Sequence, residues 1–505
     1  MAQDILEEIV GRRKADIARS GSALGFAVPQ KRLRRVHRFL AERGAILEVK
    51  RASPSKGDIA PDLDAAETAK SYARAGAMAI SCLTETHYFK GTLADLAAVC
   101  RAVDEFERET GREGPAVLRK DFLLSADEVD VSYRAGADAV LLISRILDAD
   151  TMAQMAKRCE ERGMTALVEL RTDEDCEKLA HVVSRVNKSA VVCGVNSRDL
   201  RDFTIDLLAP CRLLSRIRSV MGKDARVVFE SGVRTARSAS FVGSLGFAGM
   251  LLGEAAAKSP ALRKGLVDSF VSAAETPNAR FWRHFAEREL SRRERPLVKI
   301  CGLTNERDAR AAQELGADML GFIFWKKSPR AAGAEAVRAV RDCAAIKIGV
   351  IVDPGLPESR EAVALVKAGE LDALQVHTIG GARAFLADAE LSALPHYCAV
   401  NISAESGADA LAELFDSGEP RVLVDAQADG KIGGTGTAIP DGLVRLAQKT
   451  YRLWLAGGVS GANAAEISAQ FRPELVDVAS GVERSPGEKD RAKLEALFRA
   501  LGRAV

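Results

Sequence analysis

A short apolar run followed by a helix-like stretch repeats along nearly all of the 505-residue chain. Near-continuous apolar runs that alternate with amphipathic helices are typical of parallel strands covered by helices. The first half contains eight such runs, at residues 45–51, 78–85, 116–122, 138–143, 165–170, 191–197, 226–232 and 249–254. Eight repeats favour a closed (β/α)8 barrel over an open sheet.

The same rhythm restarts at Leu297 and continues to the end of the chain. Eight further runs follow, at residues 297–303, 319–324, 346–351, 373–377, 396–402, 421–426, 452–458 and 475–482. Each half has the usual size of an α/β barrel, about 200–250 residues. We therefore predict an α/β protein with two (β/α)8 TIM barrels in tandem, at residues 1–271 and 297–505, joined by a linker at 272–296.

Two segments lie outside this rhythm. Apolar residues at helical spacing predict an added N-terminal helix from Ile5 to about Lys14, and a second short helix through residues 33–40. The linker mixes arginines with glutamates and ends at Pro296. Interleaved charges favour a partly helical, solvated linker over a basic recognition patch.

Composition argues against nucleic-acid and membrane partners and against a disulfide framework. A net charge of +2 gives no general attraction to nucleic acid or membrane, and no stretch approaches the roughly 20 unbroken apolar residues of a membrane span. The N-terminus lacks the basic start and apolar block of a signal peptide. Nine cysteines without a Cys-x-x-Cys pair indicate reduced thiols and argue against structural zinc. We expect a cytoplasmic monomer whose partners are small molecules.

Ionisable and amide side chains collect at the ends of the strands predicted in the first half. In chain order they are Glu48, Lys50, Lys120, Glu169, Asn196, Arg198, Glu230 and Glu254. Barrel active sites form at these carboxyl ends, and strand alternation places Glu48 and Lys50 on the same side. Solvated loop charges or ion pairs would explain one such strand end. Six of eight are harder to explain in that way, because barrel interiors are mostly branched apolar side chains.

Five motifs in this half resemble indole-3-glycerol-phosphate synthase in order, spacing and strand context. They are Ile46-Leu-Glu-Val-Lys-Arg-Ala-Ser-Pro-Ser-Lys-Gly57, Leu118-Arg-Lys-Asp-Phe122, Leu167-Val-Glu-Leu170, Gly194-Val-Asn-Ser-Arg-Asp-Leu200 and Glu230-Ser-Gly-Val233. The family is a (β/α)8 barrel with added N-terminal helices. The resemblance covers residues 1 to about 270. It implies closure of the indole ring of 1-(2-carboxyphenylamino)-1-deoxyribulose 5-phosphate, with loss of carbon dioxide and water.

The resemblance also implies catalytic roles. Lys120 would be the general acid at the ketone oxygen, and Lys50 would hold the substrate carboxylate and assist proton transfer. Glu169 and Glu48 would be the bases, and Asn196 would orient groups by hydrogen bonds. We expect neighbouring charges to move the pKa of the Lys120 ammonium toward neutrality, as acid catalysis requires.

Further residues would bind the substrate by the same resemblance: Ser53, Phe122, Arg198, Glu230, Ser231, Gly232 and Gly253. Ser53 and the backbone N–H groups around the two glycines would hold the phosphate, because no Cβ blocks its approach there. Phe89 and Phe122 would flank the aromatic ring, although simple packing explains them equally well. Gly253-Glu-Ala-Ala-Ala257 departs from the family pattern, which weakens the assignment of Glu254 only.

Six motifs in the second half resemble phosphoribosylanthranilate isomerase, from about Pro296 to the C-terminus. They are Val298-Lys-Ile-Cys-Gly-Leu-Thr304, Gly321-Phe-Ile-Phe-Trp-Lys-Lys-Ser-Pro-Arg330, Leu423-Val-Asp425, Gly433-Gly-Thr-Gly436, Leu455-Ala-Gly-Gly458 and Asp477-Val-Ala-Ser-Gly-Val-Glu483. This family is also a (β/α)8 barrel. It converts N-(5-phosphoribosyl)anthranilate, by an Amadori rearrangement, into the compound that the first barrel would consume.

The rearrangement needs an acid to open the furanose ring and a base to remove the C2 proton. The resemblance implies that Asp425 is the acid, Cys301 the base and Arg330 the partner of the anthranilate carboxylate. The phosphate would lie against Gly434, Gly436, Gly457, Gly458, Ser480 and Gly481. We expect the Cys301 pKa to lie below the free value near 8.5 and desolvation to raise the Asp425 pKa. A lone strand cysteine is more often an inert core residue, and an aspartate at a strand end can simply cap a helix.

The two resemblances together predict a bifunctional enzyme of tryptophan biosynthesis. Acid, base and backbone N–H groups suffice for both reactions, so we expect no metal and no organic cofactor. Two rivals remain. One barrel could be active and the other degenerate, or the chain could be a scaffold that binds sugar phosphates without turnover.

Overall fold

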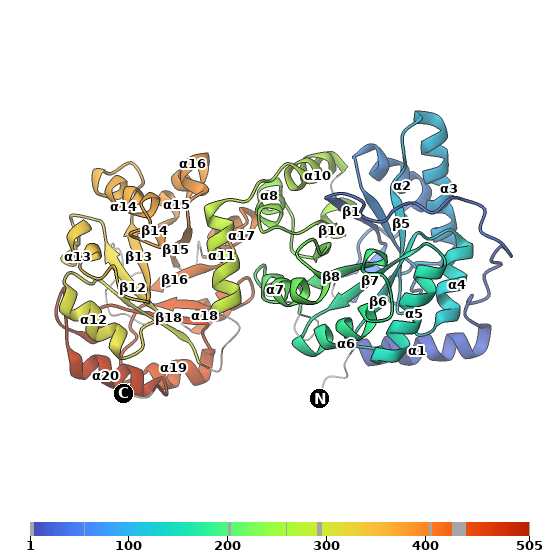
Figure 1. Cartoon of the computed structure of the whole chain (residues 1–505). Helices are drawn as coiled ribbons and strands as arrows, with labels where there is room; N and C mark the ends of the chain where they lie inside the picture. Colours follow the sequence, from blue (N-terminus) through green and yellow to red (C-terminus); the bar gives the residue numbers. More distant parts are fainter. Residues whose placement is uncertain are drawn as a thin grey trace. The chain divides into compact units, whose positions relative to one another are not determined.

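The computed structural model describes residues 5–54, 56–199, 204–258, 260–289, 295–402, 407–426 and 441–503. The chain divides into two compact units, Met1–Ala274 and Glu275–Val505. In each unit eight parallel strands close into a barrel, with helices between them along the chain (Figure 1). The predicted fold class is therefore confirmed.

The first barrel pairs its strands in the order β1, β10, β9, β8, β7, β6, β5, β4 and back to β1. The strands are β1 (Gly44–Val49), β4 (Ala79–Leu83), β5 (Ala116–Lys120), β6 (Ala139–Ile143), β7 (Thr165–Leu170), β8 (Val191–Asn196), β9 (Val227–Glu230) and β10 (Gly249–Leu252). A two-stranded ribbon, β2 (Ala52–Ser53) and β3 (Gly57–Asp58), follows β1. Several predicted runs extend one or two residues past the observed strands, because site residues continue into the loops that begin there.

Side-chain caps define where many of the surrounding helices begin. Asp64, Asp148 and Thr172 each accept a hydrogen bond from a backbone N–H of the helix that follows. The α-helices of this unit are α1 (Ile5–Ser20), α2 (Ala65–Arg74), α3 (Leu93–Thr110), α4 (Ala126–Ala135), α5 (Ala149–Glu161), α6 (Asp173–Val183), α7 (Ala209–Met221), α8 (Ala236–Ser244), α9 (Glu254–Lys258) and α10 (Arg263–Val271).

The predicted helix α1 is present. The prediction of a second N-terminal helix is wrong, because residues 31–43, all of them described, contain no helix. Contacts with Asp138 determine the path of the backbone in this segment. Its carboxylate oxygens lie 2.5 Å from Arg32 Nη2 and 2.9 Å from Arg34 Nη1. The backbone N–H of His37 donates to the same carboxylate at 3.1 Å. Residues two apart in a helix point about 200° apart, so a helix could not bring both arginines to one carboxylate.

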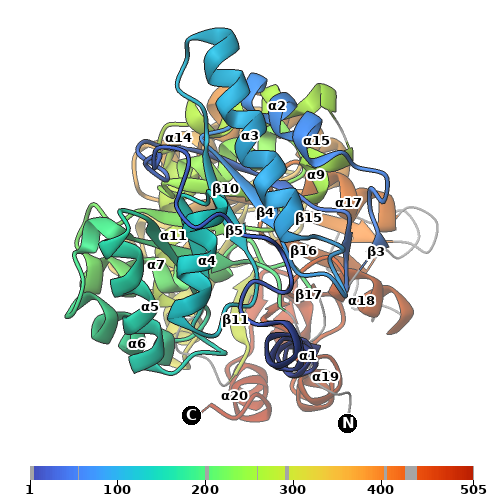
Figure 2. The ribbon, with the colours of Figure 1, turned by 90° about the vertical axis from the view of Figure 1, so that its right-hand side faces the viewer.

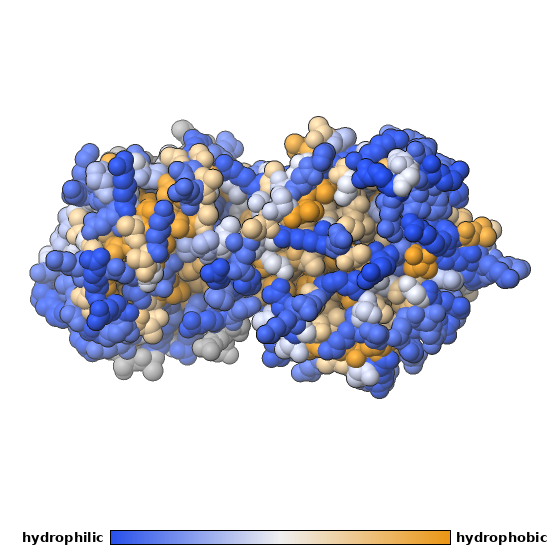
Figure 3. All heavy atoms as spheres, turned by 45° about the horizontal axis from the view of Figure 1, so that its top comes forward, coloured by the Kyte–Doolittle hydropathy of each residue, from blue (hydrophilic) through white to orange (hydrophobic). Residues whose placement is uncertain are grey.

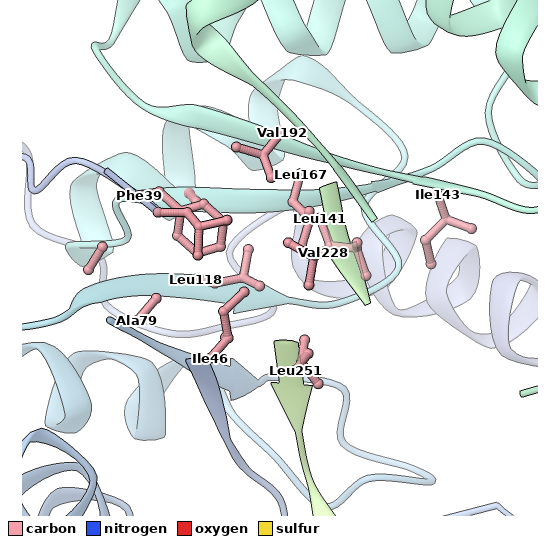
Figure 4. Close-up of a cluster of buried hydrophobic side chains, with 13 residues drawn as sticks. Phe39, Ile46, Ala79, Leu118, Leu141, Ile143, Leu167, Val192, Val228 and Leu251 are labelled. Atoms are coloured by element: carbon pink, nitrogen blue, oxygen red, sulfur yellow. The ribbon is translucent and has the colours of Figure 1, made fainter. Parts of the chain in front are cut away.

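This irregular arm places two apolar residues inside the barrel. Phe39 and Leu40 are fully buried and pack with inward-facing strand residues such as Ile46 and Leu118 (Figure 4). A Cβ at Gly249, the first residue of β10, would come within 2.9 Å of Leu40 Cδ2. The arm therefore closes the amino end of the barrel and leaves the carboxyl end for polar residues.

Helix α1 lies at the carboxyl ends of β4 and β5. Asp16 Oδ2 lies 2.7 Å from Nε2 of His87, which follows β4, and Arg13 Nη1 lies 3.2 Å from Asp121, which follows β5. Figures 1 and 2 both place α1 at one end of its barrel. The added helix thus braces the loops next to the predicted site.

The second barrel pairs its strands in chain order, from β11 to β18 and back. The strands are β11 (Leu297–Cys301), β12 (Met319–Ile323), β13 (Ile346–Ile351), β14 (Ala373–His377), β15 (His396–Ile402), β16 (Val422–Ala426), β17 (Trp454–Ala456) and β18 (Leu475–Val478). The α-helices are α11 (Pro277–Arg288), α12 (Glu306–Glu314), α13 (Ala334–Arg338), α14 (Pro357–Lys367), α15 (Ile379–Ala387), α16 (Ala389–Ser392), α17 (Gly407–Asp416), α18 (Asp441–Gln448), α19 (Ala464–Phe471) and α20 (Arg491–Ala500). A hairpin, β19 (Glu483–Ser485) and β20 (Glu488–Lys489), precedes α20.

The predicted linker contains α11, which packs into the second unit. The Trp282 side chain is fully buried, its ring centroid lies 5.9 Å from that of Trp454, and its Nε1–H donates to the His396 carbonyl at 3.1 Å. The Phe285 ring lies 5.7 Å from Trp454. Arginines such as Arg280 occupy the exposed face of the helix. This segment therefore contributes to a core as well as carrying solvated charges.

Apolar surface is sparse over the described residues. Three large hydrophobic side chains are clearly exposed there: Leu33, Leu262 and Val271. Hydrophilic side chains cover most of the face shown in Figure 3, with hydrophobic ones in small groups between them. Within the described ranges no helix combines the length and apolar character that crossing a membrane would need.

Replacing Trp282 by alanine should destabilise the second unit by about 3–5 kcal/mol, the usual effect of emptying a buried aromatic site. Urea unfolding followed by tryptophan fluorescence measures this unit alone, because Trp282, Trp325 and Trp454 all lie in it. Arg280→Ala, on the exposed face of the same helix, is the control and should change stability by less than about 0.5 kcal/mol. A loss below about 1 kcal/mol for Trp282→Ala would contradict a packed role for α11.

Candidate active sites

Three charged side chains meet at the carboxyl end of the first barrel. Glu48 of β1 is almost completely buried, and its two oxygens lie 2.7 Å from Lys50 Nζ and 2.9 Å from Lys120 Nζ. Glycine at 253 makes room for this arrangement: a Cβ there would come within 2.6 Å of Lys50 Nζ and 2.7 Å of the Glu48 carboxylate. Charged residues from the ends of β1 and β5 therefore form one cluster, as the sequence predicts for Glu48, Lys50 and Lys120.

The cluster keeps Glu48 and Lys120 charged. Burial raises the pKa of Glu48, but Lys120 and Lys50 outweigh it and lower the pKa to about 2. Burial also lowers the pKa of Lys120, yet Glu48 and Glu230 outweigh it and raise the pKa above its ordinary value. The expected shift of Lys120 toward neutrality is therefore wrong, because carboxylates from neighbouring strands surround the ammonium.

Glu230, the last residue of β9, differs from the other carboxylates. Its Oε2 lies 3.7 Å from Lys120 Nζ, and within the described part of the chain neither of its buried oxygens has a hydrogen-bond partner. Gly194 leaves the space, since a Cβ there would come within 2.3 Å of Oε1. Burial and the nearby Glu169 raise its pKa to about 7, against the opposing effect of Lys120. Such a carboxylate can take up and release a proton near neutral pH.

Two further arginines lie near the predicted site residues: Arg171 follows β7 and Arg234 follows β9. Arg171 Nε lies 3.4 Å from Glu169 Oε1, and Arg171 Nη1 donates to the Arg198 carbonyl at 3.1 Å. Asn196 Oδ1 accepts the Arg198 backbone N–H at 3.0 Å, which turns the chain after β8. Burial lowers the Arg198 pKa and Arg234 lowers it further, against the opposing effects of Glu254 and Glu48. Guanidinium groups and carboxylates therefore lie close together at this edge of the mouth.

The chain bends sharply after β9, where a phosphate site is expected. Ser231 and Gly232 have φ values of 73° and 84°, and this left-handed region is unusual for serine. A Cβ at position 232 would come within 2.7 Å of Ile205 Cγ2, so glycine is needed. Sharp backbone turns of this kind can present N–H groups to anions. Ser53 lies in the ribbon after β1.

Phe89 and Phe122 lie against each other, with ring centroids 6.1 Å apart and planes inclined at 38°. The loop that carries Phe89 is fixed by Glu85, whose carboxylate accepts the backbone N–H groups of His87, Tyr88 and Phe89. The structure thus brings the two predicted aromatic residues together beside the end of β5.

A cavity of about 780 Å³, counting its open mouth, lies at the carboxyl end of the second barrel. Its lining contains most of the residues predicted there: Cys301, Arg330, Asp425, Gly457, Gly458, Ser480 and Gly481. Gly434 and Gly436 lie outside the described residues. The cavity therefore brings the predicted acid, base and most of the predicted phosphate-binding residues together.

Cys301 ends β11 with its sulfur beside a buried ammonium. Lys299 Nζ donates to Cys301 Sγ at 3.4 Å and to Asp477 Oδ2 at 2.6 Å. Burial and Asp477 raise the pKa of the Cys301 thiol, against the opposing effects of Lys299 and Lys489. The expected low thiol pKa is therefore wrong for the structure described here, because burial and a carboxylate from β18 outweigh the two cations.

Asp425, the predicted acid, lies near the end of β16 and is almost completely buried. Its Oδ2 lies 3.8 Å from Nε2 of His377, a buried residue that ends β14. Burial and the charge of Lys299 lower the His377 pKa to about 4, so the imidazole is neutral at neutral pH. His377 Nδ1 lies 3.1 Å from Gln375 Nε2, an amide donor, which favours the Nε2–H tautomer facing Asp425.

Arg330 is held in place by the hairpin that follows β18. Its Nε and Nη2 pair with both oxygens of Glu483 at 2.8–3.0 Å. Lys489 Nζ lies 2.9 Å from Glu483 Oε1 and donates to the Cys301 carbonyl at 2.6 Å. Gly302, with φ of 74°, leaves space for Arg330, since a Cβ there would come within 2.6 Å of Arg330 Cδ. One chain of contacts thus connects the predicted base to the predicted carboxylate-binding residue.

A family model described as indole-3-glycerol phosphate synthase matches residues 6–267, more than half of the chain. The chain belongs to the indole-3-glycerol phosphate synthase family. A second model, described as N-(5'-phosphoribosyl)anthranilate isomerase, matches residues 298–500. Both resemblances drawn from the motifs are therefore confirmed, in the predicted order along the chain.

Relatives of this synthase-family chain include proteins in which both halves align. The tryptophan biosynthesis protein TrpCF of Vibrio cholerae is 30% identical, and the match covers 90% of this chain and 86% of that protein. The multifunctional tryptophan biosynthesis protein of Phanerodontia chrysosporium is also 30% identical over 90% of this chain. That protein is longer, and the chain spans 62% of its length. The crystal structure of phosphoribosyl anthranilate isomerase from Thermus thermophilus is 31% identical, covering 41% of this chain and 98% of that one, with a TM-score of 0.33.

Sequence reasoning missed several residues at the two sites of this family member. They are Arg171 and Arg234 in the synthase-family barrel, and Lys299, Gln375, His377 and Asp477 in the isomerase-family barrel. The sequence did contain a signal for Lys299. A lysine two residues before Cys301 in an apolar strand points to the same side of the strand as that cysteine. Asp477 begins one of the six isomerase-like motifs and His377 ends a predicted strand, but nothing local indicates which partners they meet.

Glu230→Gln should remove a pH dependence from the stability of the synthase-family unit. Because burial raises the Glu230 pKa from 4.5 to about 7, the unfolded chain binds fewer protons than the folded one between these values. The free energy of unfolding should therefore fall as pH rises from about 4.5 to 7, by at most about 3 kcal/mol. Urea unfolding followed by circular dichroism at pH 5 and pH 8 measures the difference between wild type and variant. Tryptophan fluorescence, which reports the other unit, is the internal control, and an unchanged pH dependence in the variant would contradict the assignment.

Proposed function

We propose that the chain is a bifunctional enzyme of tryptophan biosynthesis. In this proposal the C-terminal barrel isomerises N-(5-phosphoribosyl)anthranilate to 1-(2-carboxyphenylamino)-1-deoxyribulose 5-phosphate, and the N-terminal barrel converts that compound to indole-3-glycerol phosphate. The observation that carries it is that each barrel mouth holds its own acid–base cluster, in a unit matched by the corresponding family. The names of the relatives, which concern tryptophan biosynthesis, support the same pathway.

The isomerisation would use groups that line the second cavity. Asp425 would protonate the furanose ring oxygen, so that the C1–O bond breaks and an iminium forms. The Cys301 thiolate would then take the C2 proton, and the C–H electron pair would move into the iminium to give an enolamine. Arg330, fixed by Glu483, would pair with the anthranilate carboxylate. Backbone N–H groups at Gly457, Gly458, Ser480 and Gly481 would hold the phosphate.

Ring closure would use the charged cluster of the first barrel. Lys120 would donate a proton to the ketone oxygen as the aromatic carbon attacks, and Lys50 would hold the carboxylate that leaves as carbon dioxide. Glu169 would act as base in rearomatisation and dehydration. Glu48 is a weak base, since two lysines lower its pKa to about 2, so we assign it the positioning of both ammonium groups. Glu230, with a pKa of about 7, is the better partner for exchanging protons with Lys120.

Remaining parts of the first site would recognise the substrate. Ser53, Ser231, Gly232 and Gly253 would surround the phosphate, with Arg198 adding positive charge. Phe89 and Phe122 would flank the aromatic ring. The proposed steps move protons and carbon-bound electron pairs only, so we propose that neither site needs a metal or an organic cofactor. Nine cysteines without a Cys-x-x-Cys pair support a reducing compartment such as the cytoplasm, where we propose that the chain acts as a monomer.

Lys120→Met should lower the rate of ring closure by about 10²- to 10⁴-fold, because a positioned general acid usually contributes that much. Isomerisation of phosphoribosylanthranilate should keep its wild-type rate. Chromatographic assay of indole-3-glycerol phosphate and of the intermediate measures both reactions separately. Lys157→Met, an exposed lysine of α5, is the control. Full ring-closure activity in Lys120→Met would refute the assigned acid.

Cys301→Ala should reduce isomerisation by at least about 10²-fold and leave ring closure of the supplied intermediate unchanged. Cys343→Ala, a buried cysteine that does not line the cavity, is the matched control. An equimolar mixture of Lys120→Met and Cys301→Ala proteins should restore the coupled reaction from phosphoribosylanthranilate to indole-3-glycerol phosphate. Failure of the mixture, or of the wild-type coupled assay, would favour a degenerate barrel or a binding scaffold.

A further inference from the structure

A fully buried lysine lies directly beneath the cysteine of the second site. Lys299 and Cys301 are two residues apart on β11, so their side chains leave the strand on the same side. The three N–H groups of the Lys299 ammonium have three acceptors: Asp477 Oδ2 at 2.6 Å, Gln375 Oε1 at 2.6 Å and Cys301 Sγ at 3.4 Å. Tyr397 also donates to Gln375 Oε1, at 2.9 Å, and so fixes that amide. The ammonium is therefore held with one donor aimed at the sulfur.

The neighbouring strand is shaped around this contact. Gly321 of β12 lies opposite Cys301, and a Cβ there would come within 2.8 Å of Cys301 Sγ and 3.0 Å of Lys299 Cε. Any larger residue would separate the thiol from the ammonium. Lys299 itself has no exposed surface, whereas Cys301 lines the cavity. Lys299 can therefore act on a bound molecule only through its neighbours.

Other charged groups face this site from the surrounding elements. Lys489 of β20 also lies close, but its ammonium donates to the Cys301 carbonyl oxygen and not to the sulfur. Asp477 of β18 pairs with the Lys299 ammonium, with Oδ2 2.6 Å from Nζ. Three further titratable or charged groups line the cavity: Arg330, His377 and Asp425. Of the cations near Cys301 in the described structure, Lys299 is the one that donates to the sulfur.

We propose that Lys299 is a positioning residue for isomerisation: its buried ammonium is the counter-ion that stabilises the Cys301 thiolate, and Asp477 limits how much of that charge reaches the sulfur. The inference rests on the proposed function for the role of the thiolate as base. In the step it serves, an S–H bond forms, the C2–H bond breaks, and its electron pair moves into the iminium. Asp477 and Gln375 keep the ammonium in place while the thiol gains and loses its proton.

The electrostatics support opposite effects for the two neighbours. Burial lowers the pKa of Lys299, but Asp477 and Cys301 outweigh it and raise the pKa well above its ordinary value, so the ammonium stays charged. Burial and Asp477 raise the Cys301 pKa while Lys299 lowers it. Removing the lysine charge should therefore disfavour the thiolate, and removing the aspartate charge should favour it.

The test is the pH dependence of Cys301 alkylation by iodoacetamide in the full-length protein, with no substrate added and the modified peptide quantified by mass spectrometry. Only the thiolate reacts, so the midpoint reports the thiol pKa. Lys299→Met should raise the midpoint by about one pH unit or more, which is a roughly tenfold loss of rate at pH 7. Asp477→Asn should lower it. Lys347→Met, a buried lysine of β13 that contacts the Cys343 carbonyl, is the matched control and should leave it unchanged.

Opposite shifts in the two variants support the proposal, and shifts in the same direction, or an unshifted midpoint in folded Lys299→Met, overturn it. Circular dichroism checks folding. If Lys299→Met does not fold, Asp477→Asn decides alone, and a midpoint that stays or rises overturns the proposal. The acidic limb of the isomerase pH–rate profile should move with the alkylation midpoint. Opposite alkylation shifts in a protein without isomerase activity would refute the proposed function while leaving the Lys299–Cys301 coupling intact.

Discussion

Closure of eight parallel strands into a ring is the constraint on which both sites depend. Every strand of a barrel ends on the same side, so residues far apart in the sequence arrive at one mouth. Glu48, Lys120 and Glu230 come from strand ends up to 182 residues apart and form one charged cluster. The same geometry brings Cys301 and Asp425 into one cavity in the second barrel. In the first barrel, apolar side chains and the arm before β1 fill the space beneath the site.

Charges at these mouths are buried, and burial without partners would be strongly unfavourable. In the first barrel the Glu48 carboxylate pairs with two lysines. In the second barrel the Lys299 ammonium has three hydrogen-bond acceptors. Glu230 is the exception, because its buried oxygens have no hydrogen-bond partner in the described structure and its pKa rises to about 7. A group left unsatisfied in this way is poised to change its protonation state, which suits the proposed role in proton exchange.

Segments added to the barrels contribute to each site from a distance. The arm fixed by Asp138 closes the amino end of the first barrel, while α1 braces the loops at its carboxyl end through Arg13 and Asp16. In the second unit the hairpin after β18 holds Arg330 through Glu483. Each of these contacts joins polar side chains from elements distant in the sequence. The proposed substrate-binding residues therefore depend on contacts that lie outside the barrel repeat itself.

The sequence by itself determined the two barrels, their order and the residues that stand at strand ends, because strand and helix periodicity and motif order are local properties of the chain. It predicted the cluster of Glu48 and Lys120, yet it failed for residues 33–40, where Asp138 rather than helical spacing decides the path of the backbone. Only the tertiary structure decided the protonation of Lys120 and Cys301. Their pKa values depend on burial and on carboxylates that other strands deliver within a few ångströms, and neither quantity is written in the residues adjacent to them.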